Sequence, residues 1–431
     1  MIFSKWHRFG VLRASGRVAG LTLPAVLCAG LCLSAVAQAE ILPLSVAMSR
    51  AAQADPAAMA TQKRLAATEA GIRQAGVRPN PSVGLEAENV LGSGPYSGLS
   101  QAETTLSYQQ PLERKSKREA RIGAASAQND LARAEGRVRT WEAMTAAQRL
   151  WVEAVVAEAE TELAGQRLKL AEQSQAEIRR RVTAARDPLF AGSLAETEVA
   201  TARIAHDQAA AKVRQLKTQL AALWGGAAEF ELEAKWLEGT PVISEPALME
   251  TPDIEVLRAR QRLSAAQLKV ETTRRVQDPT VSAGIRHFQG DGAVAFIIGG
   301  SIPLNRNDAY RGHIDRARAD SEAASADIEV AERYRQRDIT AATLRMTDLA
   351  HEAQRIETEV IPQAETALRQ VREGFVRGGF TYRDVIGTQQ TLMAAKARRL
   401  EVLKQFHIEQ INRDRLSGKW LALLPDVEAA Q

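Results

Sequence analysis

The sequence is poor in the residues that build catalytic and metal centres. Its two cysteines, Cys28 and Cys32, both lie between residue 1 and Ala39 of the 431-residue chain. The six histidines are not paired at metal-ligand spacing, and His351-Glu352 lacks the second histidine of a zinc-protease helix. No phosphate-binding loop or Gly-x-Ser-x-Gly motif occurs. We therefore expect no disulfide or thiolate site after Ala39, no resident metal or cofactor, and no enzyme.

Long hydrophobic runs are also scarce. After Ala39 the chain has no 18 consecutive apolar residues, so it predicts no transmembrane helix. The segment 1–39 contains four basic residues, the apolar stretch Val18–Val36 and the small-x-small sequence Ala37-Gln38-Ala39. This order predicts a signal peptide over 1–39, the alternative being an uncleaved anchor helix. An exported chain of this kind can enter a membrane only as β-strands.

The charge of the chain does not favour nucleic acid as a partner. The formal net charge is +4, and the four basic residues of the predicted signal peptide account for all of it. The mature chain is then neutral, and a basic surface for nucleic-acid binding loses its support.

The most informative feature that is present is a very long helix, Glu113–Arg186. The stretch has no proline, and its three glycines are isolated among strong helix formers. At ~1.5 Å per residue it would extend roughly 110 Å. Such a helix cannot fold back into an ordinary domain, so it predicts a coiled coil, a repeat array or a barrel of helices.

A second copy of this pattern indicates an internal duplication. Asp308–Arg377 reads as another long helix, interrupted once at Pro362, and each long helix follows a Pro-Leu step. The predicted organisation is a first repeat over residues 40–226, a connector over 227–252, a second repeat over 253–420 and a tail over 421–431.

Each repeat also contains a predicted hairpin between two helices. The strands are Ser82–Leu91 with Ala102–Gln109, and Val281–Phe288 with Ala293–Ile302. Four strands cannot close a barrel, so a membrane role requires further copies of the chain. The alternative is a pair of soluble hairpins on a helical stalk. The flanking helices are predicted over Leu44–Gly76, Leu194–Trp224, Ile254–Val276 and from the turn at 378–381 to about Leu416.

With this order, the chain resembles the TolC-type outer-membrane factors, in particular those of heavy-metal (cobalt-zinc-cadmium or copper) efflux systems. The local patterns that carry the resemblance are Asn80-Pro81, Pro111-Leu112-Glu113-Arg114 followed by Lys117 and Arg118, Ile361-Pro362-Gln363-Ala364, Gly378-Gly379-Phe380-Thr381 and Asp384-Val385-Ile386. They occur in the family's order over nearly all of residues 40–420.

The resemblance implies a mainly α fold with a small β part. Three chains would complete a 12-stranded β-barrel in the outer membrane of a Gram-negative bacterium, continued into the periplasm by an α-barrel of long coiled-coil hairpins. The homotrimer would be a passive exit duct for heavy-metal cations, joined to an inner-membrane resistance-nodulation-division (RND) pump through a periplasmic adaptor. The alternatives are a multidrug or type I secretion duct of the same fold, and a periplasmic coiled-coil scaffold or adaptor.

The resemblance also places a gate at the helix tips. The residues implied for the gate and a cation-selective ring are Thr197, Glu198, Phe380 and Asp384. Glu198 and Asp384 are interpreted as equivalent acids of the two repeats, because the same offset in residue number relates Gly192 to Gly378. The alternative is that both are ordinary helix-start acids. Phe380 replaces an arginine that locks the best-known member, and Gly387 replaces a second ring aspartate.

The remaining tip residues are assigned to locking and docking. We hypothesise that Phe380 narrows the entrance and that other charged groups supply the lock. The candidates for these salt bridges are Arg186, Asp187, Arg377 and Arg383. The first helical hairpin has its turn predicted at Asp187–Ser193. Exposed residues at Leu189–Ser193 and 378–381 would receive the adaptor, the alternative being ordinary turn formers. The docking candidates are Leu189, Phe190, Gly192, Ser193, Gly378, Gly379 and Thr381.

Overall fold

The computed structural model describes residues 40–54, 58–233, 237, 243–304 and 308–425. The predicted signal peptide and parts of the predicted connector and tail lie outside these ranges. The described residues belong to one structural unit, Glu40–Gln431. Among the described helices, none combines the length and the hydropathy that a transmembrane span requires.

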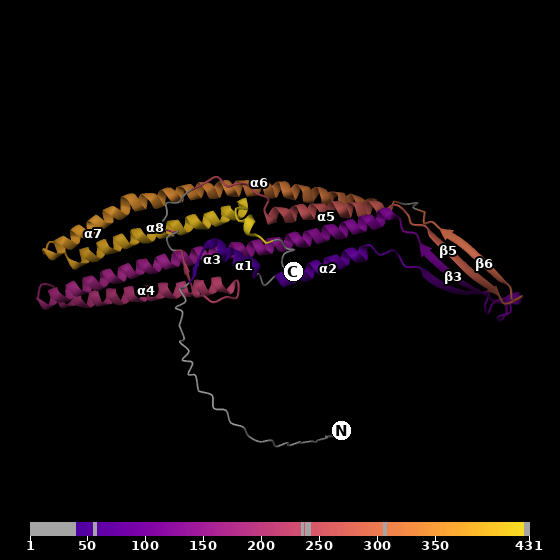
Figure 1. Ribbon diagram of the computed structural model, residues 1–431, viewed down its shortest axis with the longest axis horizontal. Helices are drawn as coiled ribbons and strands as arrows, with labels where there is room; N and C mark the ends of the chain where they lie inside the picture. Colours follow the sequence, from indigo (N-terminus) through magenta and orange to yellow (C-terminus); the bar gives the residue numbers. More distant parts are fainter. Residues whose placement is uncertain (1–39, 55–57, 234–236, 238–242, 305–307, 426–431) are drawn as a thin grey trace, which may run out of the picture. The chain divides into compact units, whose positions relative to one another are not determined.

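Two very long helical runs dominate this unit, as the sequence predicts (Figure 1). Helix α3 spans Lys115–Thr183, 69 residues. Helix α6, Arg311–Arg355, continues through a π-helical segment, Ile356–Val360, into α7, Ile361–Val376. Pro362 lies in the first turn of α7, where its missing N–H removes one backbone hydrogen bond, and the wider π turn directly before it accommodates the interruption.

The shorter helices pack against the long ones and differ from the predictions in two places. They are α1 (Leu44–Gln53), α2 (Ala58–Ala75), α4 (Leu189–Ala222), α5 (Pro252–Arg274) and α8 (Tyr382–Ser417). The single helix predicted over Leu44–Gly76 is wrong, because α1 ends before the Pro56 that the prediction overlooked. Helix α4 begins five residues before the predicted Leu194, directly after Pro188, whose fixed φ suits the position before a helix.

Four strands form one antiparallel sheet at one end of the long helices (Figure 1). They are β2 (Ser82–Glu88), β3 (Glu103–Pro111), β5 (Thr280–Phe288) and β6 (Val294–Ser301), in the order β2-β3-β5-β6. Strand β2 ends three residues before the predicted Leu91, because Asn89 and Leu91 adopt positive φ angles. The two predicted hairpins thus pair with each other through β3 and β5.

The two faces of this sheet differ sharply. Residues directly opposite one another in antiparallel strands share a face. One face carries exposed apolar side chains on every strand: Val83, Leu85, Leu106, Tyr108, Val281, Ile285, Phe296 and Ile298. On the other face Arg286 donates to Glu103 Oε2 at 2.8 Å and to Thr105 Oγ1 at 2.9 Å. The sheet is therefore amphipathic, with its apolar face uncovered.

A second, two-stranded sheet was not predicted from the sequence. Strand β1 (Glu40–Leu42) pairs in parallel with β4 (Phe230–Leu232), which lies in the predicted connector. Leu42 is fully buried, and its carbonyl accepts a hydrogen bond of 2.9 Å from Trp151 Nε1 of α3. This pairing fixes both the start of the unit and part of the connector on the middle of α3, within the largest apolar core cluster.

Candidate functional site

The turns that join α3 to α4 and α7 to α8 lie at the end of the helices opposite the four-stranded sheet (Figure 1). An apolar group here, the tip cluster, contains buried residues from α3, α4, α7 and α8. Its members are Ile178, Ala191, Ala195, Phe375, Tyr382 and Val385. The two helical hairpins of the chain are therefore packed together at their tips.

Arg181 of α3 joins the same hairpins through polar contacts, and sequence reasoning missed it. Its Nε donates to Asp187 Oδ2 at 2.6 Å, and its Nη1 donates to the Phe375 carbonyl oxygen of α7 at 2.8 Å. The guanidinium carbon also lies 4.2 Å from the centre of the Phe375 ring. The side chains of Arg181 and Asp187 are 15% and 16% exposed, so this ion pair is largely shielded from water. We call this arrangement the arginine clasp.

A second polar link lies further from the tips. Gln389 Nε2 of α8 donates to Ser174 Oγ of α3 at 2.9 Å in a buried position. Because a buried amide without a partner costs free energy, this pair favours one alignment of α3 against α8. Neither residue stands out in the sequence, since their contact joins positions 215 residues apart.

The predicted lock residues have different environments. Asp187 is the acid of the arginine clasp, whereas Arg377 pairs with Glu373 of its own helix across 3.9 Å at the surface. The backbone N–H of Arg186 donates to the Arg181 carbonyl in the turn after α3. Arg383 lies in the first turn of α8 beside Asp384, and its charge helps to lower the pKa of Asp384.

Asp384 and Thr381 form a capping box at the start of α8. Thr381 donates to Asp384 Oδ2 from its backbone N–H at 2.8 Å and from its hydroxyl at 2.7 Å. These hydrogen bonds hold the pKa of Asp384 below its usual value, so the carboxylate stays ionised at neutral pH. Asp384 thus has a capping role, the alternative weighed from the sequence, and its carboxylate remains exposed at the tip.

Phe380 lies over the end of α7 and is 45% exposed. Any side chain at Gly374 would collide with the Phe380 ring, so this glycine allows the ring to fold back onto the helix. Gly378 has a φ of 84°, which closes the turn, and the Gly379 N–H donates to the Gly374 carbonyl at 2.8 Å. The turn at 378–381 is therefore compact and hydrogen-bonded.

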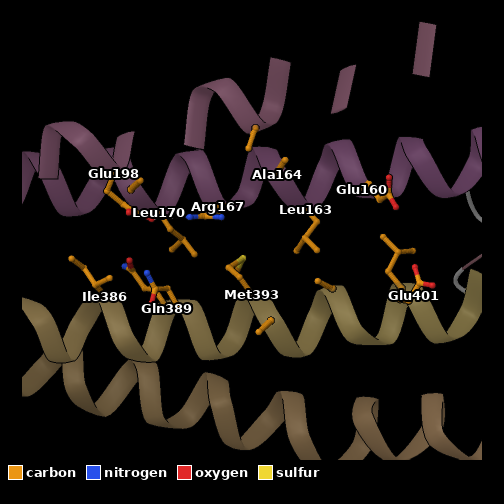
Figure 2. A pocket seen from close by; sticks show the side chains of 16 residues that line it. Glu160, Leu163, Ala164, Arg167, Leu170, Glu198, Ile386, Gln389, Met393 and Glu401 are labelled. Carbon is orange, nitrogen blue, oxygen red and sulfur yellow. Dashed lines mark hydrogen bonds and ion pairs between the residues drawn. The ribbon is translucent and has the colours of Figure 1, made fainter. Parts of the chain in front are cut away.

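Glu198 lies deeper, in an open cavity of about 650 Å³ that is lined by α3, α4 and α8 (Figure 2). Arg167 Nη2 of α3 donates to Glu198 Oε1 at 3.0 Å. Leu163 and Leu170 of α3 face Met393 of α8 across the cavity (Figure 2). Burial and the charge of Glu198 both raise the pKa of the nearby Tyr382. Thr197, the neighbour of Glu198, is exposed, and its hydroxyl donates to the Ser193 carbonyl at 2.9 Å.

The predicted equivalence of Glu198 and Asp384 is wrong. Glu198 is the tenth residue of α4, which begins at Leu189, but Asp384 is the third residue of α8, which begins at Tyr382. In residue number, the starts of α4 and α8 are as far apart as the ends of α3 and α7. The turns of the two helical hairpins are therefore equivalent in length and position. At ~1.5 Å per residue the two acids stand at levels roughly 10 Å apart along the helices. The offset that relates Gly192 to Gly378 therefore does not relate equivalent tip positions.

The docking candidates fall into two kinds. Leu189 and Phe190 are 83% and 70% exposed, and with Gly192 and Ser193 they lie within the first two turns of α4 instead of in the predicted loop. The candidates at 378–381 do lie in a turn, which ends at the Thr381 cap. The first tip thus presents an apolar helix start, and the second presents a glycine-rich turn.

Comparison with known proteins identifies the family. A family model described as outer membrane efflux protein matches residues 47–226. The nickel and cobalt resistance protein CnrC of Cupriavidus metallidurans is 30% identical over 305 residues, which cover 64% of this chain and 71% of CnrC. The chain belongs to the outer membrane efflux protein family. The cobalt-zinc-cadmium resistance protein CzcC of the same species is 28% identical over 384 residues, 88% of this chain and 90% of CzcC.

Solved structures share the fold of this outer membrane efflux protein. The outer membrane protein VceC of Vibrio cholerae matches with a TM-score of 0.66 and 22% identity, over 87% of this chain and 96% of VceC. CusC, whose structures concern transmembrane channel formation, matches with a TM-score of 0.64 and 14% identity, over 88% of this chain and 91% of CusC. The arrangement of long helices with a small sheet is therefore that of known outer-membrane channels.

Proposed function

We propose that three copies of this chain form a passive exit duct for heavy-metal cations across the outer membrane. The duct works with a periplasmic adaptor and an inner-membrane RND pump. The observation that carries the proposal is the uncovered apolar face of the four-stranded sheet, in a chain whose relatives CzcC and CnrC are named for resistance to cobalt, zinc, cadmium and nickel.

The edges of the sheet support an assembly of several chains. Strands β2 and β6 are the edge strands of the four-stranded sheet. An edge strand in lipid would leave its backbone N–H and C=O groups without partners, which is costly because no water is present there. Joining β6 of one copy to β2 of the next satisfies these groups, and three copies supply twelve strands. A periplasmic scaffold gives no reason for an uncovered apolar face on all four strands.

The tips are the proposed entrance. Asp384 contributes an ionised carboxylate from each copy, which favours cations over anions, and Phe380 contributes an apolar ring beside it. Glu198, already paired with Arg167 and at another level, contributes less negative charge to the entrance. We expect Asp384→Asn to reduce the cation preference of single channels in planar bilayers, and Phe380→Ala to raise their conductance. Unchanged cation preference in Asp384→Asn together with unchanged conductance in Phe380→Ala would contradict the assignment of these residues to the gate.

The adaptor is proposed to contact both tips. Exposed apolar residues on the first turn of α4, Leu189 and Phe190, offer area that a partner helix can bury, and the glycine turn allows close approach. Charge-changing substitutions at these two positions are expected to prevent co-purification with the adaptor while the channel still inserts into membranes.

The cargo is tested by deleting the gene in its own host. Growth is compared on zinc, cadmium, cobalt, nickel, copper and silver salts, and on dyes, detergents and antibiotics. Sensitivity to some of the metals, rescued by the intact chain, supports the metal duct and names the cargo. Sensitivity to drugs and detergents alone assigns the chain to multidrug export. Release of the chain from membranes without detergent would instead favour a periplasmic scaffold.

A further inference from the structure

Basic residues gather where the long helices leave the four-stranded sheet. Arg114 precedes the first turn of α3, Lys115 and Arg118 lie within it, and Arg311 begins α6. Neither first turn contains an acidic residue. The N-terminal end of a helix carries partial positive charge, so acidic side chains are favoured there and basic ones are not. We call these four residues the basic collar.

The apolar face of the sheet continues to the collar. The Leu112 N–H donates to the Pro279 carbonyl at 2.8 Å. The hydrogen bonding between β3 and β5 therefore continues one residue beyond Pro111, the last residue of β3. Arg114 is still extended, with φ −67° and ψ 135°. Because side chains alternate between faces along an extended chain, Leu112 and Arg114 share the face of Leu106 and Tyr108. The apolar residues of this face thus lead directly to a positive charge.

The chain that leaves the edge strand β6 repeats this arrangement. Ile302 and Leu304 follow β6 on its apolar face by the same alternation, and they are 67% and 88% exposed. Arg311 of the collar follows a few residues later, at the start of α6. In both repeats, basic residues therefore follow the uncovered apolar surface within a few positions along the chain.

The positive charge of the collar is only partly compensated by the chain. Within the described residues the side chains of Arg114 and Arg118 form no ion pair. Lys115 pairs with Glu119 across 3.4 Å, and Arg311 with Asp315 across 3.8 Å, but these side chains are 55% to 81% exposed. Ion pairs at such exposure contribute little. The collar can therefore accept an anionic partner.

We propose that the basic collar binds the anionic phosphate headgroups of phospholipids in the leaflet that adjoins the helices. Acyl chains of the same lipids would cover Leu112, Ile302 and Leu304. A free phosphate ion would neutralise the charge but leave these apolar residues in water, so the adjoining surfaces together fit a lipid. The inference rests on the proposed placement of the sheet in the membrane.

The test compares lipid association in vesicles. The full mature chain is reconstituted into phosphatidylcholine vesicles that contain spin-labelled phosphatidylglycerol or spin-labelled phosphatidylcholine, and electron spin resonance gives their relative association with the protein. We expect phosphatidylglycerol to associate several-fold more strongly. In the variant Arg114→Gln/Lys115→Gln/Arg118→Gln this preference should fall at least about fivefold and leave only the part that Arg311 contributes, because each basic residue near an anionic surface contributes about fivefold, or about 1 kcal/mol.

Two control variants test whether the position of the lost charge matters and whether substitution in the collar by itself disturbs the fold. Lys169→Gln/Arg179→Gln/Arg180→Gln removes the same charge from exposed positions toward the other end of α3 and should keep the preference. Arg114→Lys/Arg118→Lys should keep it as well. A triple collar variant that retains the full preference, or a distal control that loses it, overturns the proposal. If the wild-type chain does not associate with either vesicle type in a flotation assay, that result contradicts the proposed placement of the sheet in the membrane and not the collar proposal itself.

Discussion

Single contacts between residues far apart in the sequence determine how the tips are held. The arginine clasp joins Arg181 to the Phe375 carbonyl 194 residues away, and its largely shielded ion pair with Asp187 fixes the turn between α3 and α4. Hydrogen bonds to charged groups contribute about 1.5–3 kcal/mol each, which is large beside the marginal stability of a helix end.

Arg181→Gln tests the clasp. We expect the end of α7 to open more often, so amide hydrogen exchange over 371–377 should accelerate about tenfold or more, and channels in planar bilayers should show higher conductance. Arg180→Gln is the matched control, because Arg180 is its neighbour, is 82% exposed and pairs with Glu177 only at 3.9 Å. If exchange and conductance are the same in both variants, the clasp does not constrain the tip.

His407 of α8 gives the protein a predictable response to acid. Burial lowers the pKa of its imidazole to about 4, although a hydrogen bond with Gln410 acts in the opposite direction. In the unfolded chain the pKa is ~6.5. The stability that the neutral ring contributes is therefore full above pH 6.5 and is lost as the pH falls toward 4, by up to about 3 kcal/mol.

The thermal midpoint of unfolding between pH 7.5 and 4.5 tests this expectation. The midpoint of His407→Gln should fall less across this range than that of the wild-type chain, whereas His351→Gln, at an exposed position, should follow the wild type. His407 and Asp414 line one cavity, and burial raises the pKa of the Asp414 carboxyl. The contribution of Asp414 to stability therefore has the opposite sign, because the cost of burying its charged form is relieved as the pH falls. Identical curves for the wild type and His407→Gln would contradict the assignment.

At the scale of elements, close helix packing depends on small residues at particular positions. A Cβ atom at Gly136 of α3 would lie 2.6 Å from Thr61 Cγ2 of α2, whereas a Cβ at Gly123 of the same helix meets no atom within 4 Å. The two glycines look alike in the sequence, yet only one of them allows a neighbouring helix to approach.

These two glycines form a matched pair of substitutions. Gly136→Ala should destabilise the protein by about 1–3 kcal/mol, because α2 must shift. Gly123→Ala should stabilise it by up to about 1 kcal/mol, because alanine favours the helix. Urea unfolding followed by circular dichroism measures both, and adding Thr61→Ala to Gly136→Ala should restore most of the loss. A stabilising effect of Gly136→Ala alone would show that the helices are not tightly packed there.

At the scale of the whole molecule, the amphipathic sheet connects the fold to the membrane. Adjacent residues on β6 lie on opposite faces, so Ile298 projects from the apolar face and Ile297 from the face of Arg286. Ile298 is 90% exposed in the single chain, which is unfavourable in water and favourable in lipid.

Lysine substitutions on the two faces test this orientation. Ile298→Lys should reduce the amount of protein inserted in the outer membrane, because a lysine at mid-bilayer costs about 2–4 kcal/mol for each copy. Ile297→Lys, one residue away, should insert normally and alter the conductance. Equal insertion of both variants, measured by flotation of membrane fractions, would rule out a lipid-facing role for the apolar face.

The sequence alone determined the long helices and the two hairpins. Their signals are local, since helix formers without proline predict α3, and alternating residues predict most of β2, β3, β5 and β6. The predicted boundaries failed where Pro56 or Pro188 stops one element or starts the next. The family patterns also located the turn between α7 and α8, but the turn between α3 and α4 was predicted too far along the chain, because Leu189–Ser193 is helical. The recurrence of a glycine at Gly192 and Gly378 misled the comparison of the two acids.

Only the tertiary structure decided which residues meet. Arg181 resembles many other arginines in α3 until the fold brings the end of α7 against it, and β1 and β4 are too short to predict before they pair from distant parts of the chain. The same holds for the separate levels of Glu198 and Asp384. These features depend on contacts between distant segments, whose energies appear only when the chain is packed, whereas helix and strand preferences are set by neighbours in the chain.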